Sequence, residues 1–337
     1  MKAIAYQAAR TLKDSDYLLD IEMDKPKVSG FDVLVEVKAV SVNPVDTKIR
    51  ERVTPAEGQW GVLGWDATGI VAEIGDKVTE YKVGDQVWYA GDVTRSGSNA
   101  EFHAVDSRIV GRMPKNLSFS AAAALPLTTL TAWEMLFERL GIDETADHSK
   151  EHILIVGASG GVGSIMIQLL KARTNINVIA SASREETQAW VKQLGADYVV
   201  NHRNPLDEEV AALNLNNVKY VVSLNQTDSH LEAIANLIAP QGKFGLIDDP
   251  ENVNIAVFKR KSVSIHWEFM FTKAMFTTEN IASQRDILNT VATLVENGKV
   301  ISTLDEDFGA INAENLMKAH ALVASNKAKG KIVVSGF

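Results

Sequence analysis

The sequence predicts an α/β protein with two domains, an antiparallel β domain and a doubly wound parallel sheet. The parallel sheet is indicated by the apolar run 153–156, which leads through a glycine-rich turn at 157–163 into a segment with apolar residues at helical spacing. Residues 177–181, 185–194 and 198–200 then read as strand, helix and strand, which completes a βαβαβ unit. The antiparallel domain is indicated by short strands of period two within the first 110 residues.

The β domain is predicted to begin with a strand at residues 1–6. Over residues 31–40, Val33, Val35 and Val37 alternate with Leu34, Glu36 and Lys38, which predicts a half-buried strand. Further strands are expected at 68–74 and 85–89, next to Gly-Asp turns at 75–76 and 84–85. From about residue 113 to 141 the pattern becomes helical, with an interruption at Pro126 and a helix resuming over 131–140.

The alternation of strands and helices continues after the βαβαβ unit. Strands are predicted at 218–224, 243–247 and 263–265, with a helix at 230–238. A helix at 286–296 ends near Gly298, and a helix at 312–325 and a closing strand at 331–334 follow. The last segment is expected to return to the first domain. The predicted domains are therefore 1–125 with 285–337, and 126–284.

Composition limits the possible functions. The chain has 337 residues, 46% of them hydrophobic and 23% charged, which predicts a globular cytoplasmic protein without a membrane span. A formal net charge of −9 argues against nucleic acid as a partner. The chain contains no cysteine, which excludes disulfides and thiolate metal sites. No metal site is predicted.

The glycine-rich turn is the strongest functional signal. Glycines permit a sharp turn and close approach of a phosphate, and the N–H groups at the start of the following helix attract an anion. We therefore expect a dinucleotide pyrophosphate beside Ser159, Gly160, Gly161 and Val162. The alternative is a strand-to-helix turn that binds nothing, and Ala158 departs from the simple G-x-G-x-x-G pattern.

The end of the second strand of this unit indicates which cofactor is bound. An NAD site places a carboxylate there for the ribose hydroxyls, whereas a 2′-phosphate needs neutral donors and positive charge. Here Ser181, Ser183 and Arg184 precede the first carboxylate, Glu185, which favours NADPH. His202 and Arg203, after the third strand, could add donors to the same phosphate, or could be solvated loop residues.

Six stretches occur in a characteristic order: VNPVDTKIR at 42–50, LGWDATGIV at 63–71, VGDQV at 83–87, LTAW at 130–133, GGVG at 160–163 and GKIV at 330–333. Together with the order of domains, they resemble the medium-chain dehydrogenase/reductase superfamily over nearly the whole chain. Within it they resemble the zinc-free quinone oxidoreductase (zeta-crystallin-like) branch, including a subgroup often labelled zinc-type alcohol dehydrogenase-like. The resemblance implies a GroES-like β domain and a Rossmann domain.

The residues at the expected zinc-ligand positions conflict with the zinc that this label implies. The resemblance places Asn43, Trp65 and Leu127 where zinc-dependent relatives have Cys, His and Cys ligands. An indole N–H and an aliphatic side chain cannot ligate Zn²⁺, and an amide is a poor ligand. Without the metal, the means of ionising an alcohol is missing.

The chemistry that remains is hydride transfer from NADPH to a quinone or an α,β-unsaturated carbonyl. The resemblance implies that Asn43 and Thr131 lie beside the nicotinamide and its ribose, with Asn225 and Ile247 at strand ends in the same cleft. Asn43 could donate a hydrogen bond to the substrate oxygen, or form an Asx-type turn before Pro44. The acceptor pocket is expected to include Trp65, Tyr89 and residues 269–271, although such a stripe is also typical of a core.

No general acid is predicted. A homodimer through residues 263–271 is a further expectation from the resemblance. Two alternatives to the reductase remain: a zinc-dependent alcohol dehydrogenase, and a nucleotide-binding protein without turnover.

Overall fold

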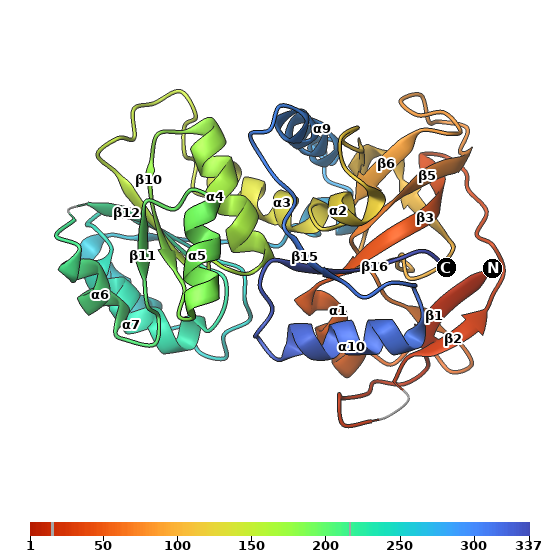
Figure 1. Ribbon diagram of the computed structural model, residues 1–337, viewed down its shortest axis with the longest axis horizontal. Coiled ribbons are helices and arrows are strands. Elements are labelled where there is room, and N and C mark those ends of the chain that lie inside the picture. Colours follow the sequence, from red (N-terminus) through yellow and green to blue (C-terminus); the bar gives the residue numbers. More distant parts are fainter. Residues whose placement is uncertain (15–16, 216) are drawn as a thin grey trace. The chain divides into compact units, whose positions relative to one another are not determined.

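The structure is a computed structural model that describes residues 1–14, 17–215 and 217–337. Contacts within the chain divide it into two compact units (Figure 1). Unit 1 comprises Met1–Leu130 and Phe271–Phe337, and unit 2 comprises Thr131–Met270. No helix in the described part of the chain is long and apolar enough to cross a membrane.

Unit 1 contains two sheets. The smaller has the order β2-β1-β4, and the larger, seven-stranded sheet has the order β15-β16-β3-β5-β6-β8 with β7 paired to β3. The strands are β1 (Lys2–Tyr6), β2 (Leu19–Glu22), β3 (Asp32–Val42), β4 (Gly61–Val62), β5 (Ala67–Ile74), β6 (Gln86–Tyr89), β7 (Phe102–Asp106), β8 (Val110–Arg112), β15 (Leu304–Asp307) and β16 (Lys331–Ser335). All pairs are antiparallel except β15 with β16.

Strand β16 brings the end of the chain back to unit 1. It pairs with β3, with Ile332 opposite Val42 and Val334 opposite Val40. The predicted return of the last segment to the first domain is therefore seen in the hydrogen-bond register. The helical elements of this unit are α1 (Pro44–Arg52), η1 (Ser107–Ile109), α2 (Phe119–Ala123), α8 (Thr272–Met275), α9 (Ser283–Glu296) and α10 (Ala313–Ala324), and α3 (Pro126–Trp133) spans the boundary between the units.

Unit 2 is a six-stranded, wholly parallel sheet with the order β11-β10-β9-β12-β13-β14. The strands are β9 (His152–Val156), β10 (Asn177–Ser181), β11 (Tyr198–Val200), β12 (Val218–Ser223), β13 (Lys243–Leu246) and β14 (Ser264–Trp267). The helices are η2 (Glu134–Arg139), α4 (Gly161–Arg173), α5 (Glu185–Gln193), α6 (Leu206–Ala212), α7 (Thr227–Leu237) and η3 (Ile255–Lys261). The strand order reverses between β9 and β12, which is the doubly wound arrangement that was predicted.

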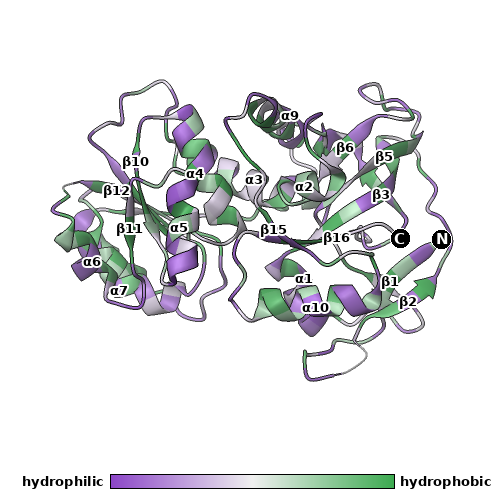
Figure 2. Ribbon diagram, in the orientation of Figure 1, coloured by the Kyte–Doolittle hydropathy of each residue, from purple (hydrophilic) through white to green (hydrophobic). Residues whose placement is uncertain are grey.

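Right-handed crossovers determine which face of the sheet each helix covers. The chain moves from β9 to β10 and β11 through α4 and α5, and then in the opposite direction through α6 and α7. The two pairs of helices therefore cover opposite faces, and α6 packs on α7. Figure 2 shows the strands of this sheet mainly in hydrophobic colours, as expected for a sheet covered on both sides.

Helix η2 differs from the sequence prediction of one α-helix over 131–140. The α-helix α3 ends at Trp133 and a π-helical segment, Glu134–Arg139, follows. Met135 in this segment fits against Gly245 of β13, where an added Cβ would lie 2.4 Å from the Met135 sulfur. Helix periodicity alone cannot distinguish the two helix types.

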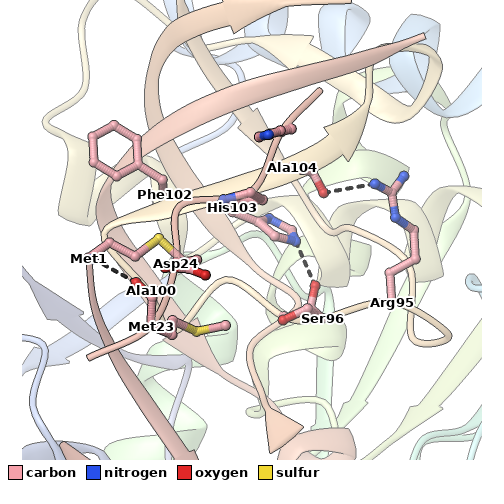
Figure 3. A pocket seen from close by; sticks show the side chains of 12 residues that line it. Met1, Met23, Asp24, Arg95, Ser96, Ala100, Phe102, His103 and Ala104 are labelled. Carbon is pink, nitrogen blue, oxygen red and sulfur yellow. Dashed lines mark hydrogen bonds between the residues drawn. The ribbon is translucent and has the colours of Figure 1, made fainter. Parts of the chain in front are cut away.

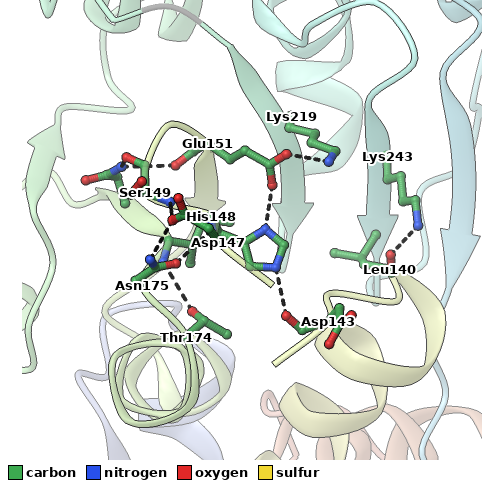
Figure 4. A network of polar contacts seen from close by, with 12 residues as sticks. Leu140, Asp143, Asp147, His148, Ser149, Glu151, Thr174, Asn175, Lys219 and Lys243 are labelled. Carbon is green, nitrogen blue, oxygen red and sulfur yellow. Dashed lines mark hydrogen bonds and ion pairs between the residues drawn. The ribbon is translucent and has the colours of Figure 1, made fainter. Parts of the chain in front are cut away.

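A polar network holds the segment before β9 (Figure 4). The His148 ring bonds Glu151 through Nδ1 at 2.6 Å and the Asp143 carbonyl through Nε2 at 2.8 Å, and Lys219 of β12 pairs with Glu151 at 2.5 Å. The acidic linker is thereby attached to the amino ends of the strands.

Candidate functional site

The glycine-rich turn joins β9 to α4 at the point where the strand order reverses. Gly157 has φ +79°, a left-handed conformation that favours glycine, and Gly160 is the N-cap of α4. Because this N-cap has no side chain, no capping group of its own competes for the first N–H groups of the helix. Such groups at a switch point form an anion site in doubly wound sheets.

Two close approaches show why the turn requires glycine. A Cβ on Gly157 would lie 2.5 Å from Oδ1 of Asn225, which follows β12, and a Cβ on Gly163 would lie 2.4 Å from the Ala158 carbonyl oxygen. The structure thus brings Asn225 to the glycine turn. Ile247 follows β13, and its N–H donates to the Ser223 carbonyl at 3.3 Å. Ser159, Gly161 and Val162 are half-buried in the turn and the first residues of α4.

Ser181, at the end of β10, joins the turn to the loop after β11. The Gly157 N–H donates to Ser181 Oγ at 3.0 Å, and Ser181 Oγ lies 3.2 Å from His202 Nδ1. Since Oγ accepts from Gly157, its own hydrogen can be donated to His202. Three segments distant in sequence are therefore joined at the carboxyl ends of β9, β10 and β11.

The remaining predicted cofactor residues lie nearby in sequence or in α3. Ser183 is half-buried between β10 and α5, and Arg184 is the N-cap of α5 and pairs with Glu186 at 3.0 Å. Arg203 is exposed in the loop after β11. Thr131 is buried in α3.

In unit 1, the side chain of Asn43 is buried and fully engaged. Its Nδ2 donates to the Ser41 carbonyl and to Asp66 Oδ2, both at 3.2 Å, while its Oδ1 accepts from Lys331 Nζ at 2.6 Å. Asn43 is also the N-cap of α1, and its N–H donates to Asp46 Oδ2 at 2.7 Å. The predicted hydrogen bond from Asn43 to a substrate oxygen would therefore have to replace one of the two bonds of Nδ2.

Lys331 is a buried cation at the centre of this cluster. Its ammonium contacts Asp66 Oδ2 at 3.4 Å and donates to the Val42 carbonyl at 2.7 Å. Asp66 Oδ1 accepts from the Leu127 N–H at 3.1 Å. The three residues that the resemblance places at zinc-ligand positions are thus gathered around a lysine–aspartate pair: Asn43 and Leu127 bond Asp66, and Trp65 precedes it.

Burial controls the titration of this cluster. It raises the pKa of Asp66 to about 6, although Lys331 acts in the opposite direction, and it raises the pKa of Asp46 to about 7. It lowers the pKa of Lys331, which the two carboxylates oppose. We name Asn43, Asp46, Asp66 and Lys331 the lysine cluster.

Trp65 is buried beside this cluster. Its Nε1 donates to the Asp92 carbonyl at 3.0 Å, and its ring meets Phe271 edge-on with centroids 6.4 Å apart. Of the predicted aromatic and Met segment, Met270 and Phe271 are buried and Phe269 is 50% exposed. The structure therefore brings Trp65 and Phe271 together.

Tyr89 is buried on β6 and bonded to His103 of β7. The Tyr89 hydroxyl lies 3.0 Å from His103 Nδ1, and His103 Nε2 lies 2.8 Å from the Ser96 carbonyl. A carbonyl only accepts, so Nε2 carries the hydrogen and the neutral ring accepts the Tyr89 proton at Nδ1. Burial lowers the pKa of His103 to about 4 and raises that of Tyr89. The hydroxyl proton of Tyr89 is thus already committed.

His103 also borders a cavity of about 260 Å³ in unit 1 (Figure 3). Met23, Arg95 and Phe102 line it with His103, whereas Asn43, Trp65 and Tyr89 are not among its lining residues. Arg95 is held by a two-pronged ion pair with Asp32 at 2.7 and 2.8 Å. The cavity is therefore separate from the predicted substrate residues.

The residues of unit 1 do not fit a zinc site. No group of three or more His, Asp or Glu side chains suited to a metal ion occurs in residues 1–14, 17–215 and 217–337. The Lys331 ammonium already lies against Asp66. A second cation there would be repelled by the first.

Sequence reasoning missed Lys331, Asp66 and His103 as members of these clusters. A signal for Lys331 existed, because it stands in the predicted closing strand beside Ile332 and Val333. A lysine in such a strand is buried only when it is paired. The partners on β3 and near α3 could not be inferred from local pattern.

Comparison with known proteins agrees with this architecture. The model of the alcohol dehydrogenase GroES-like domain matches residues 29–125, and that of the zinc-binding dehydrogenase matches residues 194–334. A zinc-type alcohol dehydrogenase-like protein of Staphylococcus epidermidis (strain ATCC 12228 / FDA PCI 1200) is 34% identical over 339 residues, which cover 99% of both chains.

Solved structures give the same result. A Rhizobium etli CFN 42 protein that carries the provisional name zinc-dependent alcohol dehydrogenase is 53% identical, with TM-score 0.97 and coverage of 100% of this chain and 98% of that one. The quinone oxidoreductase from Coxiella burnetii is 25% identical, with TM-score 0.81 and coverage of 100% and 99%. The chain belongs to the medium-chain dehydrogenase/reductase superfamily of oxidoreductases, as the resemblance implied.

Proposed function

We propose that the protein is an NADPH-dependent, zinc-independent reductase that transfers hydride to a quinone or an α,β-unsaturated carbonyl. The single observation that supports it most is the lysine cluster. It places the amino group of Lys331, paired with Asp66, and no metal ligand set among the residues that correspond to zinc ligands in relatives. The similarity to a quinone oxidoreductase agrees with this proposal.

Unit 2 supplies the proposed cofactor site. The N–H groups at the start of α4 hold the pyrophosphate, and Asn225 and Ile247 lie at the ends of β12 and β13 towards which a dinucleotide extends. Ser181, Ser183, Arg184 and His202 supply neutral and positive donors for a 2′-phosphate. The bound cofactor supplies a hydride, so the polypeptide needs to position and desolvate rather than to ionise the substrate.

Unit 1 supplies the proposed acceptor residues. Trp65 and Tyr89 present buried aromatic surface that suits a planar quinone or enone. Asn43 is a positioning residue in this proposal, because its amide fixes Asp66 and the turn into α1. Water completes the reduction by protonating the product oxygen or α-carbon, since the Tyr89 proton is bonded to His103.

The test is a steady-state assay that follows NADPH absorbance with a panel of quinones, enones and simple aldehydes. We expect turnover of quinones or enones that is unchanged by a chelator, in protein whose zinc content is below stoichiometry. Chelator-sensitive oxidation of alcohols would instead identify the zinc-dependent dehydrogenase that several relatives' names suggest. Tight NADPH binding without turnover on any acceptor would identify a nucleotide-binding protein.

We also propose a homodimer through residues 263–271. Strand β14 is an edge of the parallel sheet of unit 2, and Trp267 and Phe269 are 54% and 50% exposed there. Exposed aromatic side chains on an open strand edge favour pairing with another chain. Light scattering should give twice the chain mass for the native protein, and the monomer mass after Trp267→Glu; a monomeric native protein would refute the dimer.

A further inference from the structure

A pair of histidines lies at the carboxyl end of the parallel sheet. His202 follows β11, and His230 lies in the first turns of α7. Their ring centroids are 6.5 Å apart, with the rings tilted by 64°. Both side chains are half-buried.

The ring of His202 is held by a hydrogen bond to Ser181. Ser181 Oγ accepts from the Gly157 N–H and lies 3.2 Å from His202 Nδ1, to which it can donate its own hydrogen or from which it can accept one. When the hydroxyl donates to Nδ1, the neutral ring carries its hydrogen on Nε2, and in the protonated ring both nitrogens are donors; in either form Nε2 can donate to a ligand. His202 is therefore linked through one side chain to the turn that is proposed to hold the pyrophosphate.

His230 has no comparable anchor. Within the described ranges of the chain, no hydrogen bond or ion pair engages its ring. Its position in α7 places a second imidazole beside that of His202. The two histidines follow β12 and β11, which lie on opposite sides of β9 in the strand order. Two adjacent imidazoles of this kind can both donate to one phosphate group.

The charges around the pair favour neutral rings in the free protein. Burial lowers the pKa of His202, and His230 and Arg203 lower it further, while a hydrogen bond with the Ser181 backbone raises it. Burial also lowers the pKa of His230. Both rings therefore have a proton to gain when an anion arrives.

Two carboxylates in the neighbouring segments, Glu209 and Asp248, are hydrogen-bonded to other groups. Glu209 of α6 accepts from the Asn201 N–H and the Asn204 amide in the loop that carries His202. Asp248, after β13, accepts from the N–H and hydroxyl of Thr227 in α7. Neither carboxylate acts on the titration of either imidazole.

We propose that His202 and His230 bind the 2′-phosphate of NADPH with uptake of protons, so that the preference for NADPH over NADH increases as the pH falls. This inference rests on the proposed NADPH site. The protons come from solvent and go to the imidazoles, which become cations beside the phosphate. The phosphate itself would lose protons on entering a positive site. Net proton uptake on binding would therefore show that the histidines, and not the phosphate, are the groups that gain protons.

The experiment measures the affinities of the full chain for NADPH and NADH by calorimetry between pH 6.5 and 8. Each run is repeated in two buffers of different ionisation enthalpy to count the protons. We expect uptake of about half a proton or more with NADPH and none with NADH, and an affinity ratio that rises about three- to tenfold per pH unit on acidification. Zero uptake or proton release with NADPH, or a ratio independent of pH, would overturn the proposal.

Variants locate the effect. His202→Gln and His230→Gln keep a hydrogen-bond donor but cannot gain a proton, so each should flatten the pH dependence of the ratio. His266→Gln, on β14, is the matched control and should behave as the native protein; equal flattening in all three would refute a local effect. NADPH binding that is no tighter than NADH binding at any pH would overturn the cofactor assignment as well, whereas a constant preference for NADPH would overturn only the proton linkage. The calorimetric proton count on the native protein gives its answer even if a variant fails to fold.

Discussion

Replacement of Lys331 by methionine tests the lysine cluster. The change keeps most of the buried volume but removes the ammonium that contacts Asp66, Asn43 Oδ1 and the Val42 carbonyl. Removing one partner of a buried ion pair costs about 3–5 kcal/mol, because the other charge is left uncompensated. We expect a loss of about that size in the free energy of unfolding at pH 8.

The same variant should show a smaller loss at pH 5. The folded-state pKa of Asp66 is about 6, above its ordinary value of 3.8, so its protonation stabilises the fold fully below 3.8 and this stabilisation is lost as the pH rises through 6. Lys331 lowers that pKa, so its removal raises the pKa further and the deficit of the variant widens above pH 6. At pH 5 only the missing hydrogen bonds remain, at about 1–3 kcal/mol.

The assay is urea unfolding of native protein, Lys331→Met, and Lys331→Met with Asp66→Asn at both pH values. The double variant should lose the pH dependence of the single one. Lys329→Met is the matched control, because Lys329 lies two residues before the same strand and makes a partly exposed ion pair with Asp305, and it should cost less than about 1 kcal/mol. A loss below about 1 kcal/mol at pH 8 for Lys331→Met, or an equal loss at both pH values, would refute the reasoning.

Three further outcomes follow from the geometry. The contribution of His103 to the free energy of unfolding should fall by up to about 3 kcal/mol as the pH falls from 6.5 to 4, because the folded-state pKa of His103 is depressed to about 4; acid unfolding monitored by circular dichroism should therefore show the native protein losing stability relative to His103→Gln over this range. Gly157→Ala should weaken both NADPH and NADH at least about tenfold, because it adds strain of about 1–2 kcal/mol at φ +79° and a clash with Asn225. Gly141→Ala, also at positive φ, should cost stability without changing cofactor affinity, and equal effects of the two would contradict the assigned role. Arg184→Ala should weaken the binding of NADPH by about 1–3 kcal/mol in a fluorescence titration and leave the binding of NADH unchanged. Equal losses of affinity for the two cofactors would exclude a contact between Arg184 and the 2′-phosphate.

The parallel sheet could be predicted from the sequence because the patterns that indicate its strands and helices lie within short stretches of the chain. Short β-branched runs, the glycine turn and helical spacing each report a neighbouring element, and β9, α4 and β10 lie where the patterns placed them. Helix α6, the strand β15 and the helix α1 were not predicted. Helix α1 has a polar sequence, and its burial depends on tertiary contacts such as those of Arg50 with His320 of α10 at 3.1 Å.

The candidate site was predictable only in part, for the same reason. The proposed cofactor residues of unit 2 mostly follow strands of one sheet, so their order along the chain predicts their proximity. The hydrogen-bond partners of Asn43 and Tyr89 could not be predicted in this way. Lys331 is 288 residues from Asn43, and His103 is on a strand that pairs with β3 rather than with β6. Side chains assigned to a pocket by type were thus found with their polar atoms already bonded inside unit 1.

The pairing of β16 with β3 has a consequence for biosynthesis. Unit 2 is one continuous segment, Thr131–Met270, and can collapse as soon as it leaves the ribosome. Unit 1 lacks both the strand beside β3 and the counter-ion of Asp66 until Lys331–Ser335 has been translated. A nascent chain arrested before that strand should contain a protease-resistant unit 2 and an amino-terminal part of unit 1 that is still cleavable.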